Sequence, residues 1–445
     1  MNSVIQPGKQ LQEALDLNVE KLVYGGDGLA RLPADEHGRG KAVFLPFVLE
    51  GERVQAVLTE QERGFSRARA EKILESSVQR IDPACPYFQR CGGCHYQHAN
   101  YQHQLEIKAA ILKENLRRIA RLELETEPVI HPSPEWNYRN RTRLKVQTAP
   151  EFAIGYYRFR SHQLLPVEIC PISSPLLNRV IEVLWEMGRA GNFAAEIREI
   201  ELFANADDSE LLIEAYCAPE MPEASAEAWA AHAHKIGGVA GVVVFKLATG
   251  RSSVPETPAG AAGSPQLTYQ TEKASYRVSA GSFFQVNRFL TDKLVEIVTS
   301  GRSGDTALDL YAGVGLFSSV LSREFARVIA VESSPTSHAD LLYNSPIGVK
   351  AAHSIAELYL RNAAGRLRPD LIVVDPPRSG LGSTVVSILA NLRAPQITYV
   401  SCDPATLARD LGGLLASGYR VQESHLLDLF PQTFHLESVF HLVRA

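Results

Sequence analysis

The sequence predicts an α/β chain in three parts, which end in a doubly wound, mostly parallel sheet. The prediction of this sheet rests on apolar, strand-like runs that alternate with helical stretches after about residue 276. The first part is β-rich, because about five short strand-like runs lie between residues 12 and 76, a pattern that favours a small β-barrel. Between the β-rich first part and the C-terminal sheet, the sequence pattern is mixed α+β. We place the three domains at 1–78, 79–275 and 276–445.

The composition is that of an ordinary globular protein. The chain has 445 residues, of which 45% are hydrophobic and 21% charged, with a formal net charge of -5. It contains no apolar run of about 18 residues, which argues against a membrane span. No basic and then apolar secretory signal is visible at the N-terminus, so we expect a cytoplasmic protein. The acidic balance means that any nucleic-acid surface must be a local basic patch, and no obligate protein partner is evident.

Turn and helix signals mark the first two parts. Gly25-Gly26-Asp27-Gly28 predicts a hairpin, and Glu50-Gly51-Glu52 separates two further strand candidates. Apolar residues at helical spacing predict an amphipathic helix over about 105–121. Residues 248–266 are rich in Pro, Gly, Ser and Ala, and we interpret them as a flexible surface loop.

Three strand ends in the C-terminal part predict a cofactor cleft. In "LDLYAGVGLF" a strand runs into Asp309, Tyr311 and then Gly313, where glycines let the backbone approach a ligand closely. The next strand ends in Glu332, a carboxylate placed to accept hydrogen bonds from ribose hydroxyls. A tight strand-to-helix turn without a ligand remains the alternative for the G-x-G. In "LIVVDPPRSGL", Asp375 ends a third strand and two prolines stiffen the turn after it.

The most specific motif is "ITYVSCDPATLARDL", where a strand ends at Cys402. Asp403-Pro404 predicts a helix start, with Asp as N-cap and Pro in the first turn. We expect the helix dipole to lower the pKa of the Cys402 thiol, as a nucleophile requires. An inert buried cysteine is the alternative. Glu437 lies in an apolar strand-like run, which predicts either a partner or a raised pKa and a proton-transfer role.

Four cysteines have the spacing of a metal site. Cys85, Cys91 and Cys94 lie on one Gly-rich loop, and Cys170 can supply a fourth thiolate. Both zinc and a [4Fe-4S] cluster accept four thiolates, so the spacing alone leaves the metal open. The remaining cysteine, Cys217, ends an apolar strand and is expected in the core.

A basic strand is the candidate for RNA contact. Arg139, Arg141, Arg143 and Lys145 alternate with other residues, so a strand here would carry four cations on one face. Arg158 and Arg160 follow nearby, among aromatic residues. Such surfaces suit a phosphate backbone with unstacked bases. A charged edge that blocks aggregation is the alternative.

Together these motifs resemble the RNA uridine-5 methyltransferase family, in particular its iron–sulfur-containing members that act on 23S ribosomal RNA. The resemblance covers nearly the whole chain. It implies an OB-like TRAM barrel at the N-terminus, a central iron–sulfur domain and a Rossmann-like domain that uses S-adenosylmethionine. The blocks "SCDPATLARDL" and "DPPRSGL" carry it most specifically. One stretch departs from the family, since Ala352-His353-Ser354-Ile355 lacks the acidic residue usual near the adenine.

The resemblance also implies roles for single residues. It makes Cys402 the nucleophile that adds to carbon 6 of the uracil, and Glu437 the general base. The S-adenosylmethionine contacts that it implies are Gln285, Tyr311, Glu332 and Asp375, to which we add Gly313 from the G-x-G turn. The [4Fe-4S] ligands that it implies are Cys85, Cys91, Cys94 and Cys170. The implied substrate is a uridine of 23S rRNA. The alternatives are uridine 54 of tRNA, a cytosine-5 methyltransferase, and a non-catalytic RNA-binding iron–sulfur protein.

Overall fold

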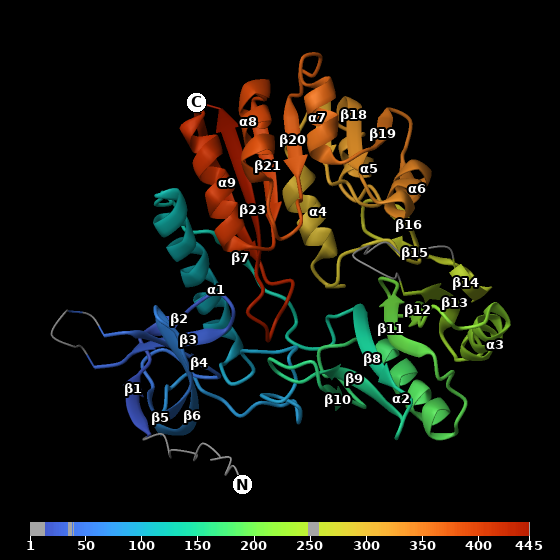
Figure 1. Cartoon of the computed structure of the whole chain (residues 1–445). Coiled ribbons are helices and arrows are strands. Elements are labelled where there is room, and N and C mark those ends of the chain that lie inside the picture. The colour runs from blue at the N-terminus through green and yellow to red at the C-terminus, as the bar shows by residue number, and fades with distance from the viewer. Residues whose placement is uncertain (1–13, 34–37, 39, 248–257, 445) are drawn as a thin grey trace, which may run out of the picture. The chain divides into compact units, whose positions relative to one another are not determined.

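The computed structural model describes residues 14–33, 38, 40–247 and 258–444 (Figure 1). The chain divides into two compact units. The smaller unit consists of the described residues up to Gln89, with Cys94–Ile107 and Gln432–Phe434. The larger unit consists of Arg90–Gly93, Lys108–Pro431 and the described residues from His435 onward. No helix among the described residues is long and apolar enough to cross a lipid bilayer.

The smaller unit contains a six-stranded sheet with the order β1-β5-β6-β4-β3-β2. Its strands are β1 (Leu15–Asn18), β2 (Lys21–Leu22), β3 (Asp27–Arg31), β4 (Ala42–Pro46), β5 (Arg53–Gln61) and β6 (Phe65–Glu75). The predicted hairpin joins β2 to β3, and Gly25 and Gly26 have φ of 106° and 91°, values that glycine adopts without strain. Alternating residues of these strands form one apolar core, as period-two patterning requires.

A buried ion pair fixes the end of this sheet. The carboxylate of Glu52 is fully buried, and Nε of Arg80 donates to it at 2.6 Å. The backbone amides of Leu49 and Ser77 donate to the same carboxylate at 2.8 and 3.2 Å. Because the charge is fully compensated, its burial is tolerated.

The predicted helix around 105–121 is α1 (Tyr101–Asn115), which continues as the π-helical segment η1 (Leu116–Ala120). Arg121 ends it in the left-handed region, with φ of 54°. The central part of the larger unit is a seven-stranded sheet with the order β10-β9-β8-β11-β12-β13-β14. Its strands and helices are β8 (Arg141–Gln147), β9 (Ala153–Tyr157), β10 (Leu164–Pro166), β11 (Ile197–Ala204), β12 (Leu211–Cys217), β13 (Val239–Lys246), β14 (Pro258–Gly263), α2 (Pro175–Arg189) and α3 (Glu223–Ala233).

The interpretation of 248–266 as a flexible loop is wrong for its second half. Residues 258–263 form β14, which pairs antiparallel with β13, whereas 248–257 lie outside the described residues. The small residues of β14 are needed for packing, because a Cβ at Gly260 would lie 2.6 Å from the backbone nitrogen of Glu227 in α3. A composition that is typical of loops therefore serves a close strand–helix contact.

The C-terminal part of the larger unit is the predicted doubly wound sheet. It has eight strands in the order β19-β18-β17-β20-β21-β23-β22-β7, and the hairpin β15-β16 precedes it. The elements are β7 (Val129–His131), β15 (Gln266–Gln270), β16 (Ser275–Ser279), β17 (Gly304–Leu310), β18 (Phe325–Glu332), β19 (Val349–His353), β20 (Leu371–Val374), β21 (Gln396–Ser401), β22 (Tyr419–Leu427), β23 (Glu437–Arg444), α4 (Thr291–Thr299), α5 (Ser318–Leu321), α6 (Pro335–Asn344), α7 (Ala356–Ala363), α8 (Gly382–Leu392) and α9 (Pro404–Ala416). Figure 1 shows α8 and α9 beside β20, β21 and β23.

The strand directions confirm the predicted alternation. β17 to β21 run parallel, and β23 enters antiparallel between β21 and β22. The sequence did not indicate the outermost strand, since β7 comes from far earlier in the chain and pairs parallel with β22. Open parallel sheets bind their ligands at the carboxyl ends of the strands, which directs attention to Leu310, Glu332, Val374 and Ser401.

Candidate active site

The turn after β17 has the backbone conformation of a ligand-binding turn. Tyr311 has φ of 63° and Gly313 has φ of 57°, so two positions lie in the left-handed region. A Cβ at Gly313 would meet nothing within 4 Å, so this backbone borders open space. Beside it, Asp309 is fully buried, and its Oδ1 has no hydrogen-bond partner. Burial raises the pKa of Asp309 to about 7.

Glu332 is fixed by backbone amides at the end of β18. The amide of Gly313 donates to its Oε2 at 2.8 Å, and those of Ser333 and Ser334 donate to its Oε1 at 2.7 and 2.6 Å. A carboxylate offers about four acceptor positions, so one remains for a hydroxyl. The carboxylate thus ties the first turn to the second strand end, which fits the cleft of a nucleoside-containing cofactor.

The stretch that departs from the family pattern follows β19. His353 ends this strand, and its ring stacks on that of His338 with 4.9 Å between centroids. Its Nε2 lies 3.0 Å from the carbonyl oxygen of Ser333. The position therefore presents an aromatic ring beside the Glu332 turn, where the family usually has a carboxylate.

Gln285 lies half-buried in the irregular segment between β16 and α4. The neighbouring residues hold this segment rigidly. The amide group of Asn287 donates to Ser133 Oγ at 2.9 Å and to the Leu429 carbonyl at 3.1 Å. Ser282 donates at 2.7 Å to the buried carboxylate of Asp340. Gln285 is therefore presented from a fixed backbone.

Asp375 follows β20, the neighbour of β17, and its amide donates to the Leu310 carbonyl at 3.4 Å. Burial, and next the nearby charge of Asp309, raise its pKa to about 7. Two carboxyl groups with raised pKa thus end adjacent strands. Such groups exchange protons near neutral pH, as general acids and bases do.

Cys402 and Glu437 lie at the same end of the sheet. In the antiparallel ladder of β21 and β23, Ser401 pairs with Ser438. Cys402 follows Ser401 and Glu437 precedes Ser438, so both residues come next to this pair at the same end of the ladder. Glu437 is buried, and burial, followed by the charge of Asp375, raises its pKa well above the usual range. The positive charge of Arg378 acts in the opposite direction, because it lowers the pKa of Glu437 and that of Cys402.

The expectation of a lowered thiol pKa at Cys402 is wrong. Burial raises the pKa of Cys402 to about 12, and the charges of Glu437 and Asp375 add to this rise. The helix start itself is as predicted, since Asp403 caps α9 by accepting from the amides of Ala405 and Thr406. This carboxylate lies at the positive helix end, and its charge adds to the rise of the thiol pKa.

Side chains of α9 that were not expected from the sequence hold the loop after Asp375. Asp410 of α9 is buried and accepts from the Leu381 amide at 2.7 Å and from the Tyr399 hydroxyl at 2.9 Å. Thr406 donates to the carbonyl of Arg378 at 3.0 Å. A charged Asp410 within the apolar pattern of a helix was the available signal. These contacts position Arg378 beside the Cys402 end of the sheet.

The described cysteines are all thiols. Cys85 and Cys94 lie in the smaller unit, and Cys91 and Cys170 in the larger one. The last two act on the same side chain, because burial and then the charges of Cys170 and Cys91 raise the pKa of Tyr156. Two thiols from distant segments therefore both lie near enough to Tyr156 to influence its pKa. Cys217 is fully buried in the core, as predicted.

The basic strand is β8, and its cations share a face but meet acidic partners. Arg141 bonds to Glu201 and lies 3.2 Å from Glu214, and its side chain is only 10% exposed. Arg143 and Lys145 both pair with Glu199. The predicted face thus exists, but its charge is largely compensated within the sheet. Arg139 precedes the strand and donates to the Arg141 carbonyl at 2.9 Å.

This sheet, with its glycine turn, its fixed Glu332 and its ionisable groups at the strand ends, defines an S-adenosylmethionine-dependent methyltransferase. Comparison with known families narrows the class. The model described as tRNA (uracil-5-)-methyltransferase matches residues 100–359 and 363–445, and the TRAM domain model matches 9–70. The chain belongs to the tRNA (uracil-5-)-methyltransferase family and carries a TRAM domain.

Individual relatives agree with this family. An RNA methyltransferase of uncharacterised function from Aquifex aeolicus is 33% identical, over 96% of this chain and 97% of its own length. The 23S rRNA (uracil(1939)-C(5))-methyltransferase RlmD of Shewanella piezotolerans is 30% identical, over 97% and 96%. The solved structure of the Pyrococcus abyssi tRNA (uracil-54, C5)-methyltransferase, in complex with S-adenosyl-L-homocysteine, superposes with a TM-score of 0.74. It is 24% identical and covers 96% of this chain and 99% of that one, so it supports the fold.

The family model and the RlmD relatives establish the reaction class. The chain is an RNA uracil-C5 methyltransferase. The cytosine-5 alternative and the non-catalytic RNA-binding alternative are thereby set aside.

Proposed function

We propose that this enzyme methylates carbon 5 of a uridine in 23S rRNA, with Cys402 as covalent nucleophile and Glu437 as general base. The observation that carries the chemistry is that Cys402 and Glu437 come next to the Ser401–Ser438 pair, at the same end of the β21–β23 ladder. Relatives that are named as 23S rRNA enzymes at 30% identity, over nearly the full length, support the substrate. We place its action in the cytoplasm, where ribosomal RNA is processed.

Uracil carbon 5 becomes nucleophilic only after a thiolate has added to carbon 6. In the resting site the thiol of Cys402 is protonated, because its pKa is about 12. Its proton can pass to Asp375, whose charge acts on the thiol. Because the pKa of Asp375 is about 7, this transfer is uphill, and it is completed only as the Sγ–C6 bond forms. The Sγ–C6 bond then forms, and the uracil ring carries the negative charge as an enolate.

S-adenosylmethionine, when bound, supplies the electrophilic methyl group that carbon 5 takes. The residues that would hold this cofactor are Tyr311, Gly313, Glu332 and Asp375 at the ends of β17, β18 and β20, and Gln285 in the segment before α4. Glu437 then removes the proton from carbon 5, the electron pair restores the C5–C6 double bond, and the Sγ–C6 bond breaks. A carboxylate with a raised pKa is a stronger base than an ordinary glutamate, which suits a carbon acid.

The two catalytic roles are tested by their different failures. Cys402→Ala should form no covalent RNA adduct, because it cannot add to carbon 6. Glu437→Gln should add and methylate but then stall, since base loss typically costs about 10²–10⁴ in rate. Incubation with radiolabelled cofactor and RNA, followed by a denaturing gel, should show label migrating with protein for Glu437→Gln alone. Equal absence of adduct in both variants would remove Glu437 from the base role.

The substrate assignment has its own test. Nucleoside mapping of RNA from cells with and without this protein should show loss of 5-methyluridine from 23S rRNA. Loss confined to position 54 of tRNA would assign the alternative substrate and leave the chemistry intact. The TRAM domain and the basic residues around β8 are the RNA-contacting candidates within the chain.

We also propose that Cys85, Cys91, Cys94 and Cys170 ligate a [4Fe-4S] cluster. The spacing of the cysteines supports this proposal, as does the influence of both Cys91 and Cys170 on the pKa of Tyr156. Cys170 is rigidly held, since its amide donates to Asn178 Oδ1 at 2.8 Å and its carbonyl accepts from Nδ2 at 3.0 Å. Anaerobically purified protein should contain iron and inorganic sulfide, which Cys170→Ala loses and the core variant Cys217→Ala retains. One zinc per chain without sulfide would refute the cluster.

A further inference from the structure

Three side chains of types that can ligate metals lie together on strands β22 and β23, apart from the residues proposed for methyl transfer. Glu423 of β22 and His441 of β23 are direct partners in the antiparallel ladder. Cβ atoms of such partners lie about 4.5–5.5 Å apart on one face of the sheet. His425 lies two residues beyond Glu423, so it shares this face and is diagonal to His441. Backbone register alone therefore brings these three side chains together.

An irregularity in β22 creates this register. Val421 pairs with Leu442, but the next paired residue is Glu423 opposite His441, so Gln422 is an extra residue in the ladder. Without this bulge, Gln422 would lie opposite His441, and Glu423 and His425 would point to the other face. Bulges that re-aim side chains are frequent beside functional sites.

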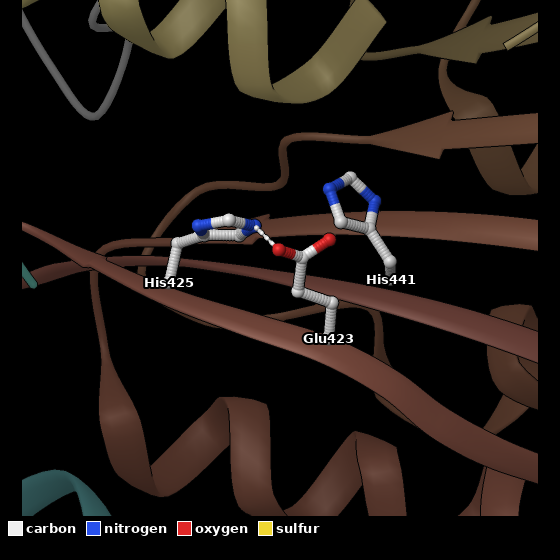
Figure 2. Close-up of side chains that lie close together, drawn as sticks. All are labelled: Glu423, His425 and His441. Atoms are coloured by element: carbon white, nitrogen blue, oxygen red, sulfur yellow. Dashed lines mark ion pairs between the residues drawn. The ribbon is translucent and has the colours of Figure 1, made fainter. Parts of the chain in front are cut away.

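The side chains point toward one another. Figure 2 shows the carboxylate of Glu423 between the imidazole rings of His425 and His441. Nε2 of His425 lies 3.4 Å from Oε1 of Glu423, and one ligand atom from each of the three residues lies within 4.8 Å of the others. Both histidines are buried, whereas the side chain of Glu423 is 51% exposed, so an ion could enter from solvent.

Surrounding residues orient both rings. Nδ1 of His425 lies 3.1 Å from Nε2 of His131 on β7, and Nδ1 of His441 lies 3.0 Å from the hydroxyl of Thr398 on β21. The Ile297 carbonyl of α4 also hydrogen-bonds to the His441 ring. Such outer partners fix the tautomer and orientation of metal-binding histidines. If His441 ligates through the nitrogen that this carbonyl holds, a metal–nitrogen bond replaces that hydrogen bond.

The charge state of the group suits a metal. Burial lowers the pKa of both His425 and His441, so both rings are neutral near pH 7 and can offer a lone pair. The positive charge of Arg302 lies near both rings and also lowers the pKa of His425 and His441. Burial lowers the pKa of Arg302, and the charge of Glu423 opposes this fall, so the carboxylate partly compensates the cation. The donor set is thus two neutral imidazoles and one carboxylate.

We propose that Glu423, His425 and His441 bind a divalent transition-metal ion of the zinc type. Two imidazoles and one carboxylate form a donor set that zinc accepts with a fourth position for water, whereas magnesium and calcium prefer oxygen alone. Bonds of about 2.0–2.2 Å draw the three ligand atoms closer than they are now, which small side-chain rotations allow. The ion would cross-link β22 to β23, the strand that begins with Glu437.

Cobalt and zinc binding to the full-length protein tests this site. Co²⁺ held by nitrogen and oxygen in a tetrahedral site gives visible absorption without the near-ultraviolet band of thiolate ligands, which separates this site from the four cysteines. We expect one such ion per chain. The exposed substitution Glu423→Gln should weaken binding at least about tenfold, and His425→Gln should do the same. The matched control His232→Gln, an exposed histidine on α3, should bind as the unaltered chain does.

Thermal unfolding gives a second readout. An ion that binds only the folded state raises the melting temperature, so Zn²⁺ should stabilise the unaltered chain and His232→Gln, but stabilise Glu423→Gln much less. Absence of bound Co²⁺ with a nitrogen–oxygen spectrum would overturn the proposal. Equal cobalt affinity in Glu423→Gln and His232→Gln would overturn it as well, because the ion would then lie elsewhere.

Discussion

Alkylation of Cys402 should report its raised pKa directly. The thiol pKa is about 12, against a usual value of 9.0, so near neutral pH the folded protein has roughly a thousandth of the ordinary thiolate fraction. A more basic thiolate is also more nucleophilic, by roughly 15- to 30-fold over three units at a Brønsted slope of about 0.4–0.5. Alkylation by iodoacetamide should therefore be about 30- to 60-fold slower than for the same cysteine in the urea-unfolded chain. Peptide mapping by mass spectrometry separates Cys402 from the other cysteines.

Neutralising the neighbours of Cys402 should speed this alkylation. Glu437→Gln should have the larger effect and Asp375→Asn a smaller one, in the order of their influence on the thiol. Asp305→Asn, at the opposite end of β17, is the control and should leave the rate unchanged. The rate should rise about tenfold per pH unit up to at least pH 10. A plateau below pH 9, or equal rates in the folded and unfolded chain, would refute the assignment of a buried, protonated thiol.

Three further outcomes concern stability. Arg141→Met should lower the free energy of unfolding by about 3–5 kcal/mol in urea titrations, because it leaves buried carboxylates unpaired, whereas the half-exposed Arg143→Met should cost less than about 1 kcal/mol. Asp340→Ala should cost a similar 3–5 kcal/mol, since this buried carboxylate accepts from Arg277 and two serines; a loss below about 1 kcal/mol would contradict that account. His441 has its pKa lowered to about 3, so its contribution is complete above pH 6.5 and is lost as the pH falls toward 3. With chelator present, the free energy of unfolding should fall by about 2 kcal/mol between pH 7 and pH 5, and a flat profile would count against a neutral buried ring.

The sequence predicted the elements of the catalytic sheet well, because each strand is a short apolar run ended by a polar residue. Asp309, Glu332, Asp375 and Cys402 lie at strand ends as expected, since that placement follows from local patterning and chain direction. The pKa of Cys402 could not be predicted in this way. It depends on burial and on carboxyl groups from two other strands, which only the three-dimensional arrangement brings near.

Contacts between residues far apart in the sequence could not be predicted either. Alternation predicted a cationic face on β8. It did not predict that the adjacent strand β11, and β12 beyond it, carry the glutamates that pair with Arg141. The interpretation of β14 as a loop was wrong for a related reason. Its small residues allow close packing against α3, a helix from an earlier part of the sequence. The roles proposed for the catalytic residues, the cofactor-binding residues and the four cysteines of the candidate metal site all stay predictions.

The strand β7 makes the catalytic sheet depend on residues far upstream. A fragment that began at residue 276 would contain every residue proposed for methyl transfer, but not Val129–His131. The outer side of β22 would then expose a row of unpaired backbone amides and carbonyls, which is a template for edge-to-edge aggregation. His425 would also lose the ring of His131 that lies against it. Separate expression of the methyltransferase part should therefore start before residue 129, and a shorter fragment is expected to be insoluble even though its active site is complete in sequence.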